Sequence, residues 1–418
     1  MSQDAAAGVG VTGSSRSAPE PLDEPHNDIV YPDAIPFALI HVAALGVFWT
    51  GVTTTAIILC VVLYLVRMWA LTAGFHRYFS HRSYKTSRWF QFVLAFLGQT
   101  SAQKGVLWWS AVHRAHHRHS DTPEDPHSPR HAGFFVSHVG WIFHRRKNQA
   151  DYSTVQDLAQ YPELVWLDRN QHMPAVALAV FTFLVAGLPG LFVGFFLSTV
   201  ILYHAVFAIN SVAHVVGKQR YVTGDDSRNN WWLALLTLGE GWHNNHHHYQ
   251  SSTRQGFFWW EVDVSYYVLR CMSWLGLVWD LRAPPESLLT GHRPLGKKVV
   301  EKVAADLAYS FPLDRIAREA QEAWGNWSDG PRDRWNGLQD GATRACERLE
   351  ATRKQIAEQL PDLQVPSLPS MEEIKSRVEA RYQETPSLDE IAERTREILL
   401  DAVAYKLLEE SGPLGDPA

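Results

Sequence analysis

The stretch Ala56-Ile-Ile-Leu-Cys-Val-Val-Leu-Tyr-Leu-Val66 lies in the first of two long apolar blocks, which cover residues 35–66 and 175–209. A helix needs about 20 apolar residues to span a bilayer, and each block is somewhat less than twice that length. Turn residues interrupt the blocks near their middle, at Thr50-Gly-Val-Thr-Thr-Thr55 and at Gly187-Leu-Pro-Gly190. The sequence therefore predicts an all-α membrane protein with four transmembrane helices in two hairpins.

The distribution of basic residues predicts the orientation of these hairpins. Neither mid-block turn contains Lys or Arg, whereas the segments outside the blocks contain Arg77, Arg82, Lys85, Arg88, Lys104, Arg114, Arg145, Arg146 and Lys147. Because cytoplasmic segments carry the excess of Lys and Arg, we expect a multi-pass protein with these segments and both termini in the cytoplasm. The net charge of -6 gives no indication of nucleic-acid binding.

Composition divides the chain into three parts. Residues 1–30 are rich in Ser, Ala, Gly, Pro and acidic residues and predict a disordered cytoplasmic start. Residues 31–290 hold both apolar blocks and form the predicted membrane domain. Residues 291–418 are charged, interrupted by proline, and predict a helical C-terminal extension.

Three histidine clusters between residues 76 and 247 carry the chemistry. They are His76-Arg-Tyr-Phe-Ser-His81, His113-Arg-Ala-His116-His117 and His243-Asn-Asn-His246-His247. In the second and third, the histidines fall at i, i+3 and i+4, so a helix would place three imidazoles on one face within reach of a common ion. All three clusters lie on the predicted cytoplasmic side, where a helical cap carrying them would form one shared site.

The ligand types restrict the metal without identifying it. The three cysteines, Cys60, Cys271 and Cys346, are far apart and form no C-x-x-C pair, so the predicted site is a nitrogen site. Imidazole suits Fe, Zn, Cu and Ni alike. Eight histidines exceed the four ligands of a tetrahedral zinc, and two metal ions are therefore the simplest interpretation. A pair of redox metals beside a membrane suggests oxygen chemistry on a lipid-like molecule.

The chain resembles the membrane-bound acyl-CoA desaturases of the stearoyl-CoA delta-9 type. The three clusters match that family in type, order and spacing, and the resemblance covers roughly residues 30 to 285. Further matches are Thr72-Ala-Gly-Phe-His76, Asp125-Pro-His127, Asn210-Ser-Val-Ala-His214 and Gly239-Glu-Gly-Trp-His243. The resemblance implies O2-dependent introduction of a cis double bond, at the delta-9 position, into a long-chain saturated acyl-CoA.

The resemblance also implies a site made of two Fe ions. Its nine ligands would be His76, His81, His113, His116, His117, His214, His243, His246 and His247, and Asn210 would hold an iron-bound water. His214 enters on the resemblance alone, because a lone histidine at the end of an apolar helix is more often a hydrogen-bonded polar residue.

Substrate contacts follow from the same resemblance. Gln103 and Trp109 would meet the bend of the acyl chain, as would Phe207, and the closed end of the substrate tunnel would lie near Cys60. Arg145 and Arg146 would lie near the CoA phosphates, although arginines just outside a span also satisfy the positive-inside rule without any ligand. The family's animal members carry Arg-Asp where this chain has Ala111-Val112, and a bend-lining Thr-Trp pair where it has Val206-Phe207, which leaves the carrier and the double-bond position open.

Other functions remain as alternatives. A di-iron acyl or alkyl hydroxylase would use a similar set of histidines, and an acyl-lipid desaturase would use a different acyl carrier. A metal transporter or sensor would more naturally place its ligands inside the spans. Carboxylate ligation through Glu124-Asp-Pro-His127 and Glu240-Gly-Trp-His243 is disfavoured, because Pro123, Pro126 and Gly241 weaken the helices that such pairs need.

Electrons must come from outside the chain. No His-Pro-Gly-Gly motif occurs, so a fused cytochrome b5-like domain is not predicted. The expected partners are O2, the lipid bilayer and a separate donor protein, which would be a ferredoxin, a rubredoxin or a cytochrome b5-like protein with its reductase.

Overall fold

The computed structural model describes residues 31–144, 149–290, 294–325, 353–354, 357–358, 360–362, 364–382 and 387–410. Most of these residues are helical, and a small antiparallel sheet pairs Lys85–Thr86 (β1) with Val278–Trp279 (β2). The N-terminal residues 1–30 and the basic pair Arg145 and Arg146 lie outside the described residues.

The first apolar block folds into helices at its predicted place. Helices α1 (Tyr31–Ala44) and α2 (Val47–Thr50) precede α3 (Thr54–Trp69), which continues directly into the π-helix η1 (Ala70–Ser80). The Thr53 hydroxyl begins α3 by accepting the amide N–H of Ala56 at 3.2 Å. Together α3 and η1 form one stretch that is long and apolar enough to cross a membrane, whereas residues 35–50 form a shorter apolar helix.

The second apolar block gives the other candidate span, Met173–His214. It contains α10 (Met173–Pro189), the π-helix η4 (Gly190–Leu197), α11 (Ser198–Ser211) and the 3-10 helix η5 (Val212–His214). Ala186 and Gly187 have non-helical angles, and Gly187 has φ +60°, which glycine adopts readily. Because α10 also packs against η4, the chain folds back at the predicted turn. The full arrangement of four spans remains a prediction.

Apolar side chains of these helices are exposed. Within the apolar 18-residue stretch of each candidate span, only 39% of the residues in the first span and 17% in the second are buried inside the protein. The exposed side chains include Ile58 and Val61 on α3 and Leu184 on α10. Since a soluble monomer rarely exposes a continuous apolar surface of this kind, lipid is the natural solvent for it.

A buried arginine ties the two candidate spans together. Arg67 on α3 is 1% exposed, and its guanidinium donates to Thr199 Oγ1 at 2.7 Å and to the Ser198 hydroxyl. Its Nε donates to the Leu63 carbonyl at 3.1 Å. A charge inside an apolar bundle is costly unless such partners surround it, so these hydrogen bonds fix α3 against α11.

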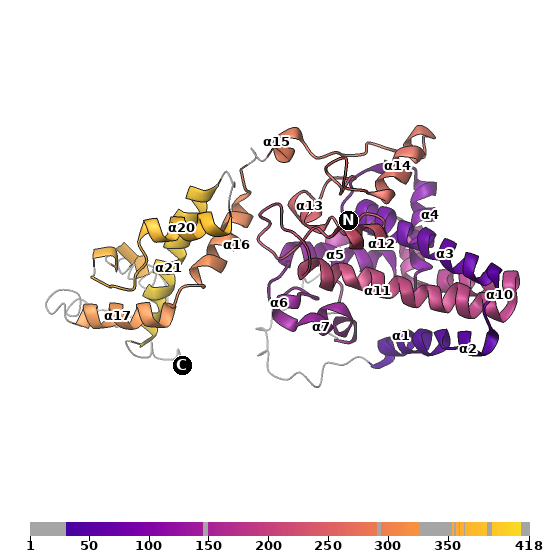
Figure 1. Ribbon diagram of the computed structural model, residues 1–418, viewed down its shortest axis with the longest axis horizontal. Helices are drawn as coiled ribbons and strands as arrows, with labels where there is room; N and C mark the ends of the chain where they lie inside the picture. The colour runs from indigo at the N-terminus through magenta and orange to yellow at the C-terminus, as the bar shows by residue number, and fades with distance from the viewer. Residues whose placement is uncertain are drawn as a thin grey trace, which may run out of the picture.

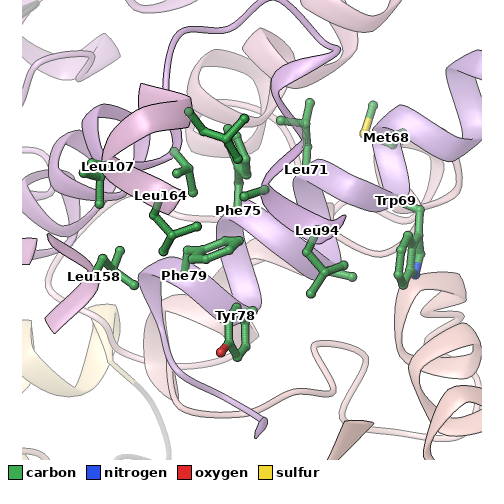
Figure 2. Packing of buried hydrophobic residues seen from close by; sticks show 14 of the residues in the cluster. Met68, Trp69, Leu71, Phe75, Tyr78, Phe79, Leu94, Leu107, Leu158 and Leu164 are labelled. Atoms are coloured by element: carbon green, nitrogen blue, oxygen red, sulfur yellow. The ribbon is translucent and has the colours of Figure 1, made fainter. Parts of the chain in front are cut away.

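The main hydrophobic core lies where η1 meets α4 (Arg88–Gln99) and α5 (Val106–His119). Figure 2 shows Phe75 and Phe79 of η1 beside Leu94 of α4 in this core. Gly98 permits the approach, because a Cβ there would lie 2.2 Å from Phe75 Cε1. The helix that carries the first histidine pair is therefore anchored in the best-packed part of the molecule.

Shorter helices surround this core. They are α6 (Pro129–Ala132), α7 (Phe134–His138), η2 (Gly140–Phe143), η3 (Tyr152–Val155), α8 (Gln156–Ala159), α9 (Pro162–Arg169), α12 (Trp231–Leu236), α13 (His243–His248), α14 (Val264–Trp274) and α15 (Glu286–Leu289).

The C-terminal helices gather around a hydrophobic core of their own. These helices are α16 (Lys297–Ala308), α17 (Leu313–Gly325), η6 (Leu360–Asp362), α20 (Met371–Arg381) and α21 (Leu388–Glu410). Figure 1 shows them, in orange and yellow, to one side of the apolar helices. We use "the extension" for the described part of residues 294–410.

Candidate metal centre

The π-helix η1 brings the first histidine pair together. The His81 amide N–H donates to the His76 carbonyl at 3.2 Å, the i+5 pattern of a π-helix. This pattern places residues five apart on nearly the same face, whereas an α-helix would separate them widely. The two imidazole rings have centroids 4.8 Å apart.

Helices α5 and α13 carry the other two histidine motifs of the sequence, residues 113–117 and 243–247. The histidines of each helix are divided between two groups in space. Nitrogen atoms of five histidines lie within 4.8 Å of one another and form what we name the first cluster: His76, His81, His113, His117 and His246. A second cluster contains His116, His214, His243 and His247. For the second and third motifs, the expectation that all three histidines reach one common ion is therefore wrong. Residues at i and i+4 share a helix face, while the histidine at i+3 turns to the other cluster.

In the first cluster the Nε2 atoms converge. The Nε2 of His246 lies 2.9 Å from that of His76 and 3.0 Å from that of His117. The Nε2 of His113 lies 2.8 Å from that of His81 and 3.0 Å from that of His117. A neutral imidazole carries one N–H, so hydrogen bonds alone cannot satisfy four such contacts among five nitrogens.

These distances fit a metal ion better. Adjacent ligands at about 90° around a metal–nitrogen bond of about 2.1 Å would lie about 3.0 Å apart, and tetrahedral ligands about 3.4 Å apart. The observed contacts of 2.8 to 3.0 Å match the first value. Five nitrogens also exceed the four ligands of a structural zinc site. The first cluster thus suits an ion of higher coordination number.

The second cluster is assembled from three parts of the chain. His116 comes from α5, His243 and His247 come from α13, and His214 comes from η5 at the end of the second candidate span. The Nε2 atoms of His214 and His243 are 3.1 Å apart. The Nε2 of His247 is buried without a hydrogen-bond partner among the described residues, as expected of a nitrogen reserved for a metal. The two clusters adjoin, since the rings of His117 and His247 have centroids 4.4 Å apart.

Buried carboxylates stand behind three histidines of the second cluster. Each contacts the Nδ1 atom, at 3.1 Å for His116 and Asp125, 2.9 Å for His214 and Asp121, and 2.8 Å for His247 and Asp225. A histidine that donates its Nδ1 proton to a carboxylate leaves the Nε2 lone pair free and fixed in direction. These pairs therefore orient the rings toward the centre of the cluster.

One such pair supports the first cluster. Glu240 contacts His76 Nδ1 through one carboxylate oxygen and Arg77 through the other, with Arg77 Nη2 at 3.0 Å. Arg77 also pairs with Asp263 at 2.9 Å, and all three charged side chains are buried. Neither Glu124, which is exposed, nor Glu240 belongs to a group of possible metal ligands among the described residues, although His116, Asp125 and His127 form a third such group.

Burial sets the protonation states of the site. It lowers the pKa of His113, His117, His243 and His246 well below the ordinary value, and neighbouring histidines lower it further. Burial would raise the pKa of Asp121, but hydrogen bonds from His214, Ser128 and the Asp226 amide outweigh it, so the pKa falls below its usual range. Neutral imidazoles and ionised carboxylates are the states that metal binding requires.

A small cavity of about 40 Å³ touches both clusters. A cavity needs about 10–15 Å³ to hold one water, so this chamber has room for small molecules such as water or O2. Its lining includes His76 and His113 from the first cluster, His116 and His243 from the second, and Asn210 from α11. Asn210 thus lies beside both clusters, and its contact with a metal-bound water stays a prediction.

A larger cavity of about 730 Å³ shares lining residues with this chamber, among them Trp109, His113 and Asn210. Most of its lining is apolar or aromatic and comes from α1, α5, α10, η4 and α11. Gln103, Trp109 and Phe207 line it, as expected, and Trp109 and Asn210 line the small chamber too. Cys60 lies on α3 and is not among the lining residues.

The carboxylates are the functional residues that sequence reasoning missed. Asp125 and Glu240 stand inside motifs that match the family, at Asp125-Pro-His127 and Gly239-Glu-Gly-Trp-His243, so a signal existed for these two. Asp121 and Asp225 lie outside any of the motifs that match the family. Their partners His214 and His247 are 93 and 22 residues away in the chain, respectively, which leaves no spacing to read.

Comparisons with known proteins agree with this geometry. The sequence model of the fatty acid desaturase family matches residues 53–270. The sn-2 palmitoyl-lipid 9-desaturase of Nostoc sp. (strain 36) is 34% identical over 261 residues, which cover 61% of this chain and 91% of that protein. The "Probable acyl-CoA desaturase" of Schizosaccharomyces pombe (strain 972 / ATCC 24843) is 33% identical over 290 residues, 67% of this chain and 60% of that protein. Acyl-CoA 5-desaturase AL21 of Anemone leveillei is 36% identical over 242 residues, 57% of this chain and 73% of that protein.

The matched region holds both clusters and ends before the extension begins. By their names, these three relatives all desaturate acyl groups, and they differ in the acyl carrier and in the position of the double bond.

Proposed function

The chain belongs to the fatty acid desaturase family, and from that premise we propose that it introduces a cis double bond at the delta-9 position of a saturated long-chain acyl-CoA. The observation that carries the proposal is the meeting of nine histidines, in two clusters, at the end of an apolar cavity. Two Fe ions bound there would supply the activation of O2. The first cluster would hold one ion and the second cluster the other.

The reaction balances with one external donor. O2 accepts four electrons, of which two come with the hydrogens of two adjacent C–H bonds and two come from the donor protein. Two protons complete the reduction to two water molecules. We propose a ferredoxin, a rubredoxin or a cytochrome b5-like protein with its reductase as the donor.

The large cavity is the proposed binding site for the acyl chain. Its volume lies within the range of about 300–1,000 Å³ that is usual for ligand sites. Trp109 stacks on His113 with ring centroids 5.0 Å apart and an interplanar angle of 15°. This contact fixes the His113 ring and gives the acyl chain a rigid wall beside the first cluster. Tyr203 and Ala102, which also line the cavity, are joined by a hydrogen bond from the Tyr203 hydroxyl to the Ala102 carbonyl at 2.9 Å.

The chain's own residues also exclude bulk water. The histidines of the second cluster are at most 8% exposed, and the chamber that touches both clusters is small. A C–H bond brought to this chamber would therefore meet an oxidant without competing solvent. Asn210 would position a water molecule there.

The acyl carrier is the finer part of the proposal. Arg145 and Arg146, which lie outside the described residues, remain candidates for contact with the CoA phosphates. An acyl-lipid substrate is a second candidate, because the Nostoc relative is named for a palmitoyl-lipid substrate. We also propose a multi-pass topology with the active site and both termini in the cytoplasm, which reporter fusions at each terminus would test.

One experiment tests the function. Cells that express the chain and grow on a defined saturated fatty acid should accumulate its cis-9 monounsaturated product, located by mass spectrometry. A hydroxy acid as the main product would replace the desaturase with a di-iron hydroxylase. Purified protein given stearoyl-CoA or a stearoyl phospholipid, with donor and O2, then decides the carrier, since only one should be turned over.

A further inference from the structure

We infer that the extension positions the second metal site, and that Lys302 and Asp306 of α16 act as positioning residues for the histidines of the second cluster. This inference rests on the proposed function only in assuming that each cluster holds an ion.

The second cluster depends on two loops. Asp121 and Asp125 lie in the loop between α5 and α6, and Asp225 lies in the loop between η5 and α12. The two loops are joined to each other, because the Asp226 amide N–H donates to Asp121 Oδ2 at 2.7 Å. The same Asp121 oxygen contacts His214 Nδ1. A shift of either loop would therefore move the carboxylates that orient the rings.

Asp121 has an uncommon backbone conformation and is held in place by buried partners. Asp121 has φ +56°, in the left-handed region that few side chains adopt. Its side chain is 2% exposed and bonded to Ser128 Oγ at 2.7 Å as well as to His214. Burying an ionised carboxylate is costly unless every such partner is in place.

One face of α16 holds both loops. Lys302 and Asp306 are four residues apart and so project from the same side of the helix. Lys302 Nζ donates to the carbonyl of Ser120, which immediately precedes Asp121. Asp306 accepts from Arg130 Nη1 at 2.8 Å, and Arg130 also donates to both carboxylate oxygens of Asp226 at 2.8 Å.

Close packing accompanies these bonds. The backbone of Gly224 lies on the aliphatic stem of Lys302, since a Cβ there would be 3.2 Å from Lys302 Cδ. Gly224 has φ +73° and directly precedes Asp225. Val222 packs against the hydrophobic core of the extension. The extension thus contacts the chain within one or two residues of Asp121 and of Asp225.

These contacts are only part-exposed, which gives them more weight than free surface ion pairs. The side chains of Arg130, Asp226 and Asp306 are 27%, 31% and 33% exposed. Arg130 binds Asp226 with two parallel N–H donors, the geometry in which arginine–carboxylate pairs are strongest. A loop held this way can transmit the position of α16 to the rings that it orients.

The test measures iron in the full-length protein, purified in detergent and challenged with a chelator. Native protein should hold two ions per chain. Lys302→Ala and Asp306→Ala should each release one ion at least about tenfold faster than native protein does, the range typical of losing an outer partner of a metal ligand. The other ion should leave at the native rate.

Arg394→Ala is the matched control. Arg394 pairs with Glu301 of the same helix α16 at 2.6 Å, on the exposed surface of the extension. Its loss should leave both release rates unchanged. Lys302→Arg, which keeps the donor, should restore slow release.

Three outcomes would overturn the inference. They are native release rates in both alanine variants, equal acceleration of both ions, and an effect of Arg394→Ala as large as that of Lys302→Ala. Should an alanine variant unfold, a double-mutant cycle of Arg130→Ala and Asp306→Asn gives the answer, because independent effects of the two changes would contradict a shared contact. Native protein that binds no iron would instead refute the proposed function.

Discussion

The two histidine clusters adjoin, yet the structure supports them by different means. The first cluster takes its five rings from η1, α5 and α13, and η1 is anchored in the main hydrophobic core. One carboxylate, Glu240, stands behind it at His76. The second cluster has four rings, and carboxylates stand behind three of them. All three of its carboxylates come from loops, and two of them, Asp121 and Asp225, lie outside any family motif.

The difference shows that packing and polar networks can each hold histidine rings in position. A ring on a well-packed helix is held by its neighbours, whereas a ring that depends on a loop needs directed hydrogen bonds. A network of buried charges keeps its shape only when it is complete, because removing one partner leaves an uncompensated charge. The second cluster should therefore be the more sensitive of the two to changes at a distance.

Removing one histidine from each cluster should have the largest effect. His246→Ala and His247→Ala change neighbouring residues of α13 that belong to different clusters. Each should lower desaturation by more than about 100-fold, beyond the 10–100-fold that the loss of an outer partner costs. Iron per chain should fall from two to one in both, as measured on purified protein. His247→Ala leaves only three rings in its cluster and should lose that ion more completely.

His248→Ala controls for changes to the same helix, because His248 stacks on Tyr221 at 4.2 Å and belongs to neither cluster. Full activity in either His246→Ala or His247→Ala would remove that histidine from the ligand set. Loss of both ions from each variant would show that the two clusters form one unit.

Carboxylate substitutions should have the next largest effect and should separate the clusters. Asp225→Asn keeps the size of the side chain but weakens the acceptor that orients His247. We expect iron affinity at the second cluster to fall about 10–100-fold, with little change in thermal stability. Chelator titration of the purified protein measures it.

Glu240→Gln should act in a different way. Glu240 neutralises the buried Arg77 as well as contacting His76, so its loss leaves a buried charge partly unpaired. The free energy of unfolding should fall by about 3–5 kcal/mol, seen as a lower melting temperature. Equal losses of stability in the two variants would contradict the contrast between a packed and a networked cluster.

Several features of the site could be predicted from the sequence. Spacing selected eight histidines as candidate ligands, and the structure gathers all eight in the two clusters, each of which could hold a metal ion. The turn at Gly187-Leu-Pro-Gly190 followed from its residues, and the structure breaks the helix there because only glycine readily takes φ +60°. His214 required the family resemblance, since its neighbours in the cluster are distant in the chain.

The rest depends on tertiary structure. The residues of His76-Arg-Tyr-Phe-Ser-His81 do not predict a π-helix. The π-helix brings together two rings that are five residues apart, a spacing that an α-helix would place on different faces. The second and third histidine motifs are divided between the two clusters, and this division depends on how the fold brings α5 and α13 together with η1 and η5. Likewise, the sequence gives Lys302 and Asp306 only as ordinary charged residues of an amphipathic helix. Their contacts with Ser120 and Arg130 arise from the tertiary structure.

The smallest expected effect concerns the small chamber that touches both clusters. Val206 is 9% exposed and lines both this chamber and the large cavity. Val206→Phe should fill the chamber and slow turnover about tenfold, because the acyl chain and O2 must both reach it. Overpacking should cost about 1–3 kcal/mol of stability. Ile201→Phe, on the exposed side of the same helix, should leave turnover unchanged.

The iron content of the purified variants distinguishes the effect of Val206→Phe from the effects of the histidine and carboxylate substitutions. Val206→Phe should keep both ions, since the substitution touches no hydrogen bond behind the rings. Selective loss of the second ion would mean that the chamber also positions that cluster, and the contrast drawn between packed and networked support would then be incomplete. Retention of both ions with slowed turnover would mean that the clusters differ in the residues that hold their histidine rings, whereas both clusters act on substrate through the shared chamber.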